Sequence, residues 1–288
     1  MRDFIVLGSG VTSFFLSCHY QCFVVGLEAQ LPPLFHIRLT DSVKEFLERH
    51  ELKYRTKTVS VGLWDGSKLI NSSDITEEMV SNYKRKTKKS SNSRFLNNMH
   101  LIYEIAEITD DKFISWFDYS RNSNPNHVRD KVVSIESRDD YYAILCESKI
   151  EYQSRSILST IPLPILCRLL NYEVDESRFL TSHKAWKNTE IRNQGFDKFD
   201  YVYDLSTSLV NRYIKFNGSW LEEHTLEPGD SDLSQYSKVM RNVQINQNLG
   251  WDSLEKYGHP RILLFGRLAQ WSNEVLVHRV IDRLLKSI

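Results

Sequence analysis

The first 28 residues constrain this chain most, because they have the order strand, glycine turn, helix, strand. Residues 4–7 are apolar, a Gly-Ser-Gly turn begins at Gly8, and a largely apolar stretch leads to a second apolar run over residues 23–27. This order is typical of a βαβ unit that binds a dinucleotide at its glycine turn and helix N-terminus. Glu28 ends the second run at the distance where an acid can bind ribose hydroxyls.

Each small residue of the turn has a distinct role in such a unit. Gly8 permits the tight turn, and Gly10 allows a pyrophosphate to approach the backbone. The third glycine of G-x-G-x-x-G is replaced by Ser13, which is small enough to preserve close packing of helix on strand. The alternative is an ordinary buried strand and turn of an α/β protein. The segment predicts that a dinucleotide binds here, but it does not say which dinucleotide.

Composition indicates a globular protein of one large or two small domains. Of 288 residues, 41% are hydrophobic and 26% charged, and 37 basic residues balance 37 acidic ones, so no global field favours nucleic acid or an anionic membrane. No apolar run reaches the roughly 18 residues that span a bilayer, and no signal peptide precedes the first strand. The four cysteines lack metal or redox spacing, so we expect reduced thiols in a cytoplasmic protein.

One basic, low-complexity stretch lies in the first third of the chain. Its cationic residues are Lys84, Arg85, Lys86, Lys88 and Lys89. A solvated loop is the ordinary interpretation of such a run, and a patch that contacts nucleic-acid phosphates is the alternative.

Patterning predicts the other elements. We expect helices over 41–50 with Asp41 as N-cap, over the first part of 74–90, over 95–117 and at the C-terminus, and an irregular segment over 225–257. The expected strands are a hairpin over 54–70, a pair at 132–137 and 141–146, segments at 149–152 and 156–161, two strands within 197–224, and 261–265.

Two further motifs accompany the first, ILSTIPLPIL at 157–166 and RILLFGRLAQW at 261–271. With all three motifs in this order, the chain resembles the group of FAD-dependent amine oxidases and UDP-galactopyranose mutases, from Asp3 to Leu285. The resemblance implies an α/β fold: a Rossmann-like three-layer FAD-binding domain, a smaller β-rich substrate domain and a reduced helical insertion. The implied FAD-binding segments are 1–40, 125–170 and 258–288, and the implied substrate-domain segments are 41–124 and 171–257.

The resemblance also implies cofactor-binding residues. They bind the pyrophosphate, the adenosine and the flavin, and they are Gly8, Gly10, Val11, Thr12, Ser13, Glu28, His36, Val132, Thr160, Pro162, Gly266, Arg267, Trp271 and Ser272. Glu28 matches the acid on the adenosine ribose, and Val132 matches a backbone position that holds adenine. After Gly266-Arg267, the resemblance implies a helix whose N-terminus points at the flavin.

The resemblance to the mutases implies two candidate catalytic residues, His36 and Arg212. His36, after Phe35, resembles a histidine near the isoalloxazine, and Arg212 resembles an arginine on the substrate diphosphate. The alternatives are a hydrogen-bonded loop histidine and a salt-bridge partner on a strand. Mutases carry tyrosine and aspartate after the Gly-Arg pair, whereas residues 269–276 contain neither, which argues against sugar ring contraction.

The expected function is that of an FAD-dependent oxidoreductase acting on a small-molecule amine. Hydride would pass from the C–H beside nitrogen to flavin N5, and water would hydrolyse the resulting imine. The alternatives are a flavoenzyme acting on an amino-modified base in nucleic acid, a mutase-like non-oxidative flavoenzyme, and a degenerate flavin-fold binding protein. The chain lacks the HExxH, GxSxG and GxxxxGK[ST] motifs of other chemistries. The substrate, electron acceptor and oligomeric state stay open.

Overall fold

The structure is a computed structural model, and its described residues form two compact units. Unit 1 contains residues 1–55, 106–179 and 248–288, and unit 2 contains residues 56–105 and 180–247. The described residues are 1–27, 31, 35–87, 102–118, 124–175, 177, 179, 181–191, 195–216, 218–227, 232–243, 249, 251–272 and 275–286.

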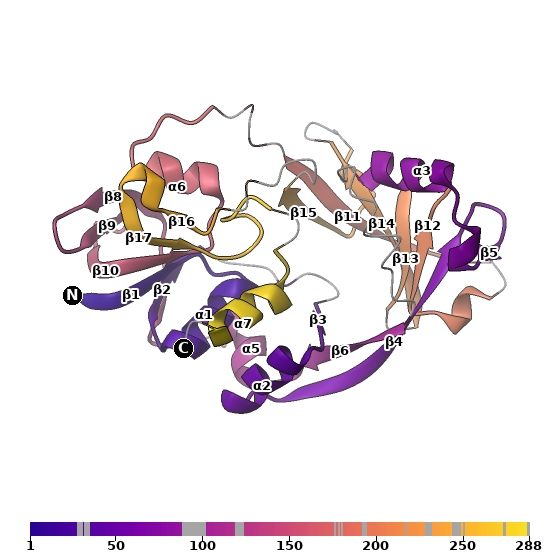
Figure 1. Ribbon diagram of the computed structural model, residues 1–288, viewed down its shortest axis with the longest axis horizontal. Helices are drawn as coiled ribbons and strands as arrows, with labels where there is room; N and C mark the ends of the chain where they lie inside the picture. Colours follow the sequence, from indigo (N-terminus) through magenta and orange to yellow (C-terminus); the bar gives the residue numbers. More distant parts are fainter. Residues whose placement is uncertain are drawn as a thin grey trace. The chain divides into compact units, whose positions relative to one another are not determined.

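Unit 1 is built on a sheet with a parallel centre (Figure 1). The strand order is β16-β17-β10-β1-β2-β7, and β9 joins β10 and β8 by antiparallel pairing. The strands are β1 (Arg2–Leu7), β2 (Phe23–Gly26), β7 (His127–Arg129), β8 (Val132–Ser137), β9 (Tyr142–Cys146), β10 (Glu151–Ser159), β16 (Ser253–Leu254) and β17 (His259–Leu264). A short 3-10 turn, η4 (Glu255–Tyr257), precedes β17.

The central strands are apolar on both faces because both faces are covered. Val6, Val24 and Leu158 are fully buried and share one core with the helices on their side of the sheet. Those helices are α1 (Val11–Tyr20), α2 (Asp41–Arg49), α5 (Asp111–Trp116) and α7 (Val277–Lys286). Figure 1 shows α6 (Leu163–Leu169) on the opposite side. This is the predicted Rossmann-like three-layer arrangement.

Unit 2 is β-rich, and most of its strand pairs are antiparallel. The second sheet has the order β15-β11-β14-β13-β12-β4-β6-β3, with β5 paired to β4. The strands of this sheet are β4 (Tyr54–Trp64), β5 (Leu69–Ile70), β6 (Ile102–Ile108), β11 (Thr181–Thr189), β12 (Tyr201–Asp204), β13 (Val210–Phe216), β14 (Ser219–Leu226), β15 (Lys238–Val243) and β3 (Ile37–Arg38), the last of which belongs to unit 1. Helix α3 (Glu77–Thr87) packs on β13 and β14. The 3-10 turns η1 (Ser72–Asp74) and η3 (Phe196–Lys198) complete the unit.

The unit boundaries differ from the predicted domain boundaries. The structure places in unit 1 several segments that were assigned to the substrate domain, namely 41–55, 106–118, 171–179 and 248–257. The cause is hydrophobic packing, since Phe46 of α2 and Phe113 of α5 are buried in the same core as α1. The chain passes between the units within β4 and β6, where no composition change marks a boundary.

Several predicted elements are confirmed. Helix α2, the hairpin of β4 and β5, the β8–β9 pair, strand β17 and helix α7 all lie where they were expected. The cap of α2 is Thr40 rather than Asp41, because the Thr40 hydroxyl accepts a hydrogen bond from the Val43 N–H at 3.2 Å.

Other predicted elements are wrong. The segment 95–117 was expected to be helical, but it contains strand β6 before the short helix α5. The two strands expected at 149–152 and 156–161 are replaced by one strand, β10, over residues 151–159, and the segment 197–224 begins three strands rather than two. The segment 225–257 is not uniformly irregular, because β15 pairs with β11, a strand that patterning did not reveal.

Candidate cofactor-binding site

The carboxyl ends of the parallel strands in unit 1 meet at one edge of the sheet. Strand β1 pairs with β2 on one side and with β10 on the other, so the direction of the connections reverses at β1. In open α/β sheets, ligands bind outside the carboxyl ends at such a switch point. The residues that follow three of these strands are Gly8, Thr160 and the pair Phe265-Gly266.

Gly8 must be glycine in this structure. Its φ is +108°, a region that favours glycine, and a Cβ there would overlap the Thr160 hydroxyl. The Thr160 Oγ1 donates to the Leu7 carbonyl at 2.9 Å, so the Ser13 Oγ, 2.7 Å away, donates to Thr160. Ser13 is fully buried, and its hydroxyl ties α1 to the end of β10. This contact explains a serine where the dinucleotide motif has its third glycine.

Two more glycines keep the turn close to its neighbours. A Cβ on Gly26, the last residue of β2, would lie 2.5 Å from Ser9 Oγ and 2.7 Å from the Gly8 carbonyl carbon. A Cβ on Gly266 would lie 2.9 Å from Thr12 Oγ1, and Gly266 has a φ of +87°. Sequence reasoning predicted Gly266 but missed Gly26, which its place two residues before the acidic Glu28 could have suggested.

Gly10 is different, because the space beside it is open. A Cβ built on Gly10 meets no heavy atom of the described residues within 4 Å. Gly10 is the N-cap of α1, and within the described chain no side chain caps this helix and no acidic residue lies in its first turn. The first N–H groups of a helix lack intrahelical acceptors and carry the positive end of its dipole. The open cradle at Gly10 therefore fits a pyrophosphate, whose oxygens can accept from Val11 and Thr12.

The C-terminal motif lies beside the same turn, because Gly266 approaches Thr12 closely. Gly266 is followed by a turn in which Gln270 N–H donates to the Gly266 carbonyl at 3.0 Å and Ser272 N–H donates to the Arg267 carbonyl at 2.9 Å. The helix that follows this motif in the described chain is α7, which begins at Val277. Trp271 is fully buried and packs against Phe179, with ring centroids 5.1 Å apart.

The remaining predicted cofactor residues lie on separate elements of unit 1. Pro162 caps α6, and Val132 begins β8, three residues after Arg129, which pairs with Gly26. His36 is half-buried and directly precedes β3, while the adjacent Phe35 ring packs against Phe113 at 5.4 Å. Glu28 lies outside the described residues.

Arg212 lies in unit 2 within a charged and aromatic cluster. Its Nε and one terminal nitrogen donate to Glu223 Oε2 at 3.1 and 2.7 Å, and the guanidinium lies over the rings of Tyr201 and Tyr203. Lys184 Nζ lies 3.3 Å from the other Glu223 oxygen. The side chain of Arg212 is 28% exposed, so it is both a salt-bridge partner and accessible to a ligand.

The Glu223 carboxylate is stabilised as an anion despite its burial. Burial alone would raise the pKa of Glu223, but Arg212 and then Lys184 lower it to about 2. Burial likewise opposes the charge on Arg212, yet Glu223 holds the pKa of that guanidinium well above its usual range. Both groups are therefore charged at neutral pH.

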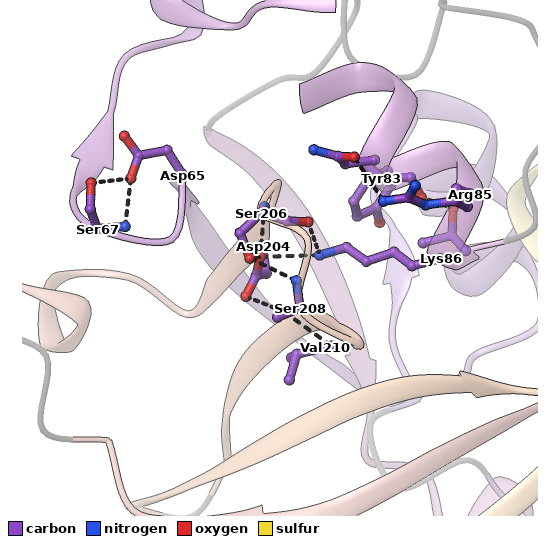
Figure 2. Close-up of polar contacts among 11 residues, drawn as sticks. Asp65, Ser67, Tyr83, Arg85, Lys86, Asp204, Ser206, Ser208 and Val210 are labelled. Atoms are coloured by element: carbon purple, nitrogen blue, oxygen red, sulfur yellow. Dashed lines mark hydrogen bonds and ion pairs between the residues drawn. The ribbon is translucent and has the colours of Figure 1, made fainter. Parts of the chain in front are cut away.

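The described part of the basic stretch, Lys84 to Lys86, does not form one exposed patch. Figure 2 shows the Lys86 ammonium pointing at Asp204, with Nζ 3.0 Å from Oδ1. Both side chains are buried, and Asp204 also accepts from Ser206 and Ser208. The Lys86 ammonium is therefore paired within unit 2 and buried, whereas the neighbouring Arg85 is exposed and donates to Asn82. Lys88 and Lys89 lie outside the described residues, and Lys84 is half-buried.

Two other kinds of site have no support in the described ranges. No described helix has the length and apolarity to cross a bilayer. The described histidines, cysteines and carboxylates include no group of three that could bind a metal ion.

The comparisons with known proteins identify the fold. The chain is similar to a solved oxidoreductase from Methanosarcina mazei, with a TM-score of 0.61, 9% identity and 99% of each chain covered. It is also similar to a cofactor-binding variant of putrescine oxidase, with a TM-score of 0.56, 8% identity, and 99% of this chain and 98% of that chain covered. The fold is therefore the Rossmann-like fold of these oxidoreductases.

A third similar structure widens the range of chemistry that this fold supports. BrvH, a flavin-dependent halogenase from Brevundimonas sp. BAL3, gives a TM-score of 0.52 at 9% identity, with 99% of this chain and 72% of that chain covered. No known family profile matches the sequence, and no curated protein matches it significantly. Identities this low define the fold and leave the activity open.

Proposed function

We propose that the chain is an FAD-dependent oxidoreductase that oxidises a C–N bond. The observation that carries this proposal is the open cradle at Gly10, on an uncapped helix N-terminus at the switch point of the sheet. The similar putrescine oxidase supports an amine as the substrate class, and the flavin-dependent halogenase supports a flavin as the cofactor.

In this proposal, unit 1 binds the cofactor in an extended form. The turn from Gly8 to Ser13 holds the pyrophosphate, with Thr160 and Gly266 fixing the turn from two sides. Glu28 binds the adenosine ribose and Val132 the adenine. The flavin end is assigned to His36, Pro162, Arg267, Trp271 and Ser272.

FAD, when bound, supplies the hydride acceptor for a C–H bond next to an amine nitrogen. The chain's own residues bind and orient. Arg212 is proposed to bind an anionic group of the substrate, because its guanidinium is part exposed and is held in place by Glu223 and two tyrosine rings. His36 is proposed to contact the flavin end of the cofactor.

The first test is the visible spectrum of the purified protein after incubation with FAD. We expect flavin absorbance that stays with the protein on gel filtration and bleaches anaerobically with a primary or secondary amine. A protein that retains no flavin would overturn the cofactor assignment. Flavin that no amine bleaches, but another reductant does, would overturn the C–N assignment alone.

A variant at Gly10 localises the site. Gly10→Val adds a side chain into open space, so it should fold with a loss of stability of about 1 kcal/mol or less, while its FAD dissociation constant rises at least tenfold, which is about 1.4 kcal/mol. Unchanged affinity in the folded variant would place the pyrophosphate elsewhere.

A further inference from the structure

Ser9, between the two glycines of the turn, is held by two side chains from outside the βαβ unit. The Trp116 indole N–H, from α5, donates to the Ser9 carbonyl at 2.8 Å. His127, at the start of β7, has its Nε2 3.1 Å from Ser9 Oγ. The two rings stack on each other, with centroids 4.1 Å apart and planes inclined by 18°. We name Trp116 and His127 the Ser9 clamp.

The contact with Trp116 determines the orientation of a peptide group. In a trans peptide, the carbonyl of one residue and the N–H of the next point in opposite directions, and the described chain has no cis peptide. Because the Ser9 carbonyl points at the Trp116 indole, the Gly10 N–H points away from Trp116. A flip of this peptide would cost the buried hydrogen bond, since Trp116 is only 4% exposed.

The contact with His127 fixes the side chain of the same residue. Ser9 is 5% exposed, and its hydroxyl also faces the close approach of Gly26. Burial and then the neighbouring Arg129 lower the pKa of His127 to about 4, so its ring is neutral near pH 7. A neutral imidazole can lie flat on the buried indole without the desolvation penalty of a charge.

We propose that Trp116 and His127 are positioning residues for the cofactor: the Ser9 clamp holds the Ser9–Gly10 peptide so that the Gly10 N–H is presented to an anionic oxygen of the pyrophosphate. This inference rests on the proposed function, because it concerns how the same turn binds FAD. Neither residue touches the cofactor in this proposal; each acts through Ser9.

The test is the affinity of the purified, flavin-free protein for FAD, and for ADP as a probe without the flavin. Trp116→Phe keeps a ring but removes the N–H donor, and His127→Leu removes the contact with Ser9. Each should raise both dissociation constants about tenfold, the size expected for one lost hydrogen bond in a buried setting. His127→Gln, which retains an amide able to reach Ser9, should restore most of the affinity. Trp251 is another tryptophan of unit 1, and its ring contacts Lys256 and Tyr257. Trp251→Phe is the matched control and should leave both constants unchanged.

The outcomes separate the two proposals. A wild-type protein that binds neither FAD nor ADP overturns the proposed function, and the clamp with it. If the wild type binds both and the clamp variants bind as well as Trp251→Phe, the clamp is overturned and the proposed function stands.

The unfolding free energy of each flavin-free variant is measured in parallel. If either variant does not fold, Ser9→Ala removes the His127 contact from the other side and should show the same loss. Two results would show that the pair has only a structural role. One is that His127→Gln binds FAD and ADP as weakly as His127→Leu, and the other is that the loss of affinity in each variant only parallels its loss of stability.

Discussion

Glu223 shows at the level of one residue how unit 2 retains buried charge. The residue is 5% exposed, and its carboxylate contacts two cations, Arg212 and Lys184. Removing one member of a buried ion pair leaves the charge of its partner buried and unpaired. The resulting loss of stability is larger than the net stabilisation that the intact pair provides. We therefore expect Glu223→Gln to lower the free energy of unfolding by about 3 kcal/mol at pH 7, measured by urea denaturation.

The same substitution has a defined pH dependence. The pKa of Glu223 is lowered from 4.5 to about 2 on folding, so its stabilisation is present above pH 4.5 and is lost as pH falls toward 2. The stability difference between wild type and Glu223→Gln should therefore shrink across that window. Glu147→Gln, which breaks the exposed pair with Lys131, is the control and should change stability by less than about 1 kcal/mol. A difference that stays constant from pH 5 to pH 2 would contradict the assigned ion pair.

Gly26 tests the effect of close packing rather than of charge. An alanine there would bring its methyl group to 2.5 Å from Ser9 Oγ and 2.7 Å from the Gly8 carbonyl carbon, so the turn must move. We expect Gly26→Ala to lower the free energy of unfolding by about 1–3 kcal/mol, the usual range for overpacking. Gly10→Ala, in open space, should lose less than Gly26→Ala. Equal losses by urea denaturation would show that the tight approach at Gly26 has no energetic weight.

At the scale of elements, the sequence pattern predicted those helices and turns whose structure depends on neighbouring residues in the chain. The hairpin turn at Gly66, with a φ of +107°, and the apolar stripe of α2 were both evident in the sequence. Strands β6 and β15 were not, because their partners in the sheet are distant in sequence and their residues do not alternate in a clear pattern. The missed strand β11 joins β14 and β15, so tertiary pairing rather than propensity determines that part of unit 2.

Helix α3 has a buried ion pair at its C-terminal turn, between Lys86 and Asp204. Lys86 reaches Asp204 and the Ser206 carbonyl, while the adjacent Arg85 is exposed (Figure 2). We expect Lys86→Ala to lower the free energy of unfolding by about 3 kcal/mol, because Asp204 stays buried without its cation. Arg85→Ala, the neighbouring control, should change it by about 0.5 kcal/mol or less. Equal small effects in chemical denaturation would mean that the Lys86 ammonium is solvated.

At the scale of the whole molecule, the three motifs were found in sequence because each is a short run at a strand end. Gly8, Thr160 and Gly266 follow β1, β10 and β17, and the parallel pairing of these strands explains why distant motifs converge. The Ser9 clamp could not be predicted, since Trp116 comes from a helix 107 residues after Ser9 and no local pattern marks it. Two domains were expected, but two of the boundaries between the units were hidden, because the chain crosses between the units inside β4 and β6.

That division leads to a prediction about how ligand binding stabilises the molecule. All described residues assigned to the ADP portion of the cofactor lie in unit 1. A ligand at 100 times its dissociation constant adds about 2.7 kcal/mol to the stability of the state that binds it. If the units open separately, ADP should raise the opening free energy measured by amide hydrogen exchange by about 2.7 kcal/mol in β1, α1 and β10. The exchange of β13 and β14 should stay nearly unchanged. The control is Gly10→Val at the same ADP concentration, where an affinity at least tenfold weaker should cut the protection to about 1.4 kcal/mol or less. Equal protection of β1 and β13, measured by mass spectrometry of peptic fragments, would show instead that the two units unfold as one cooperative unit.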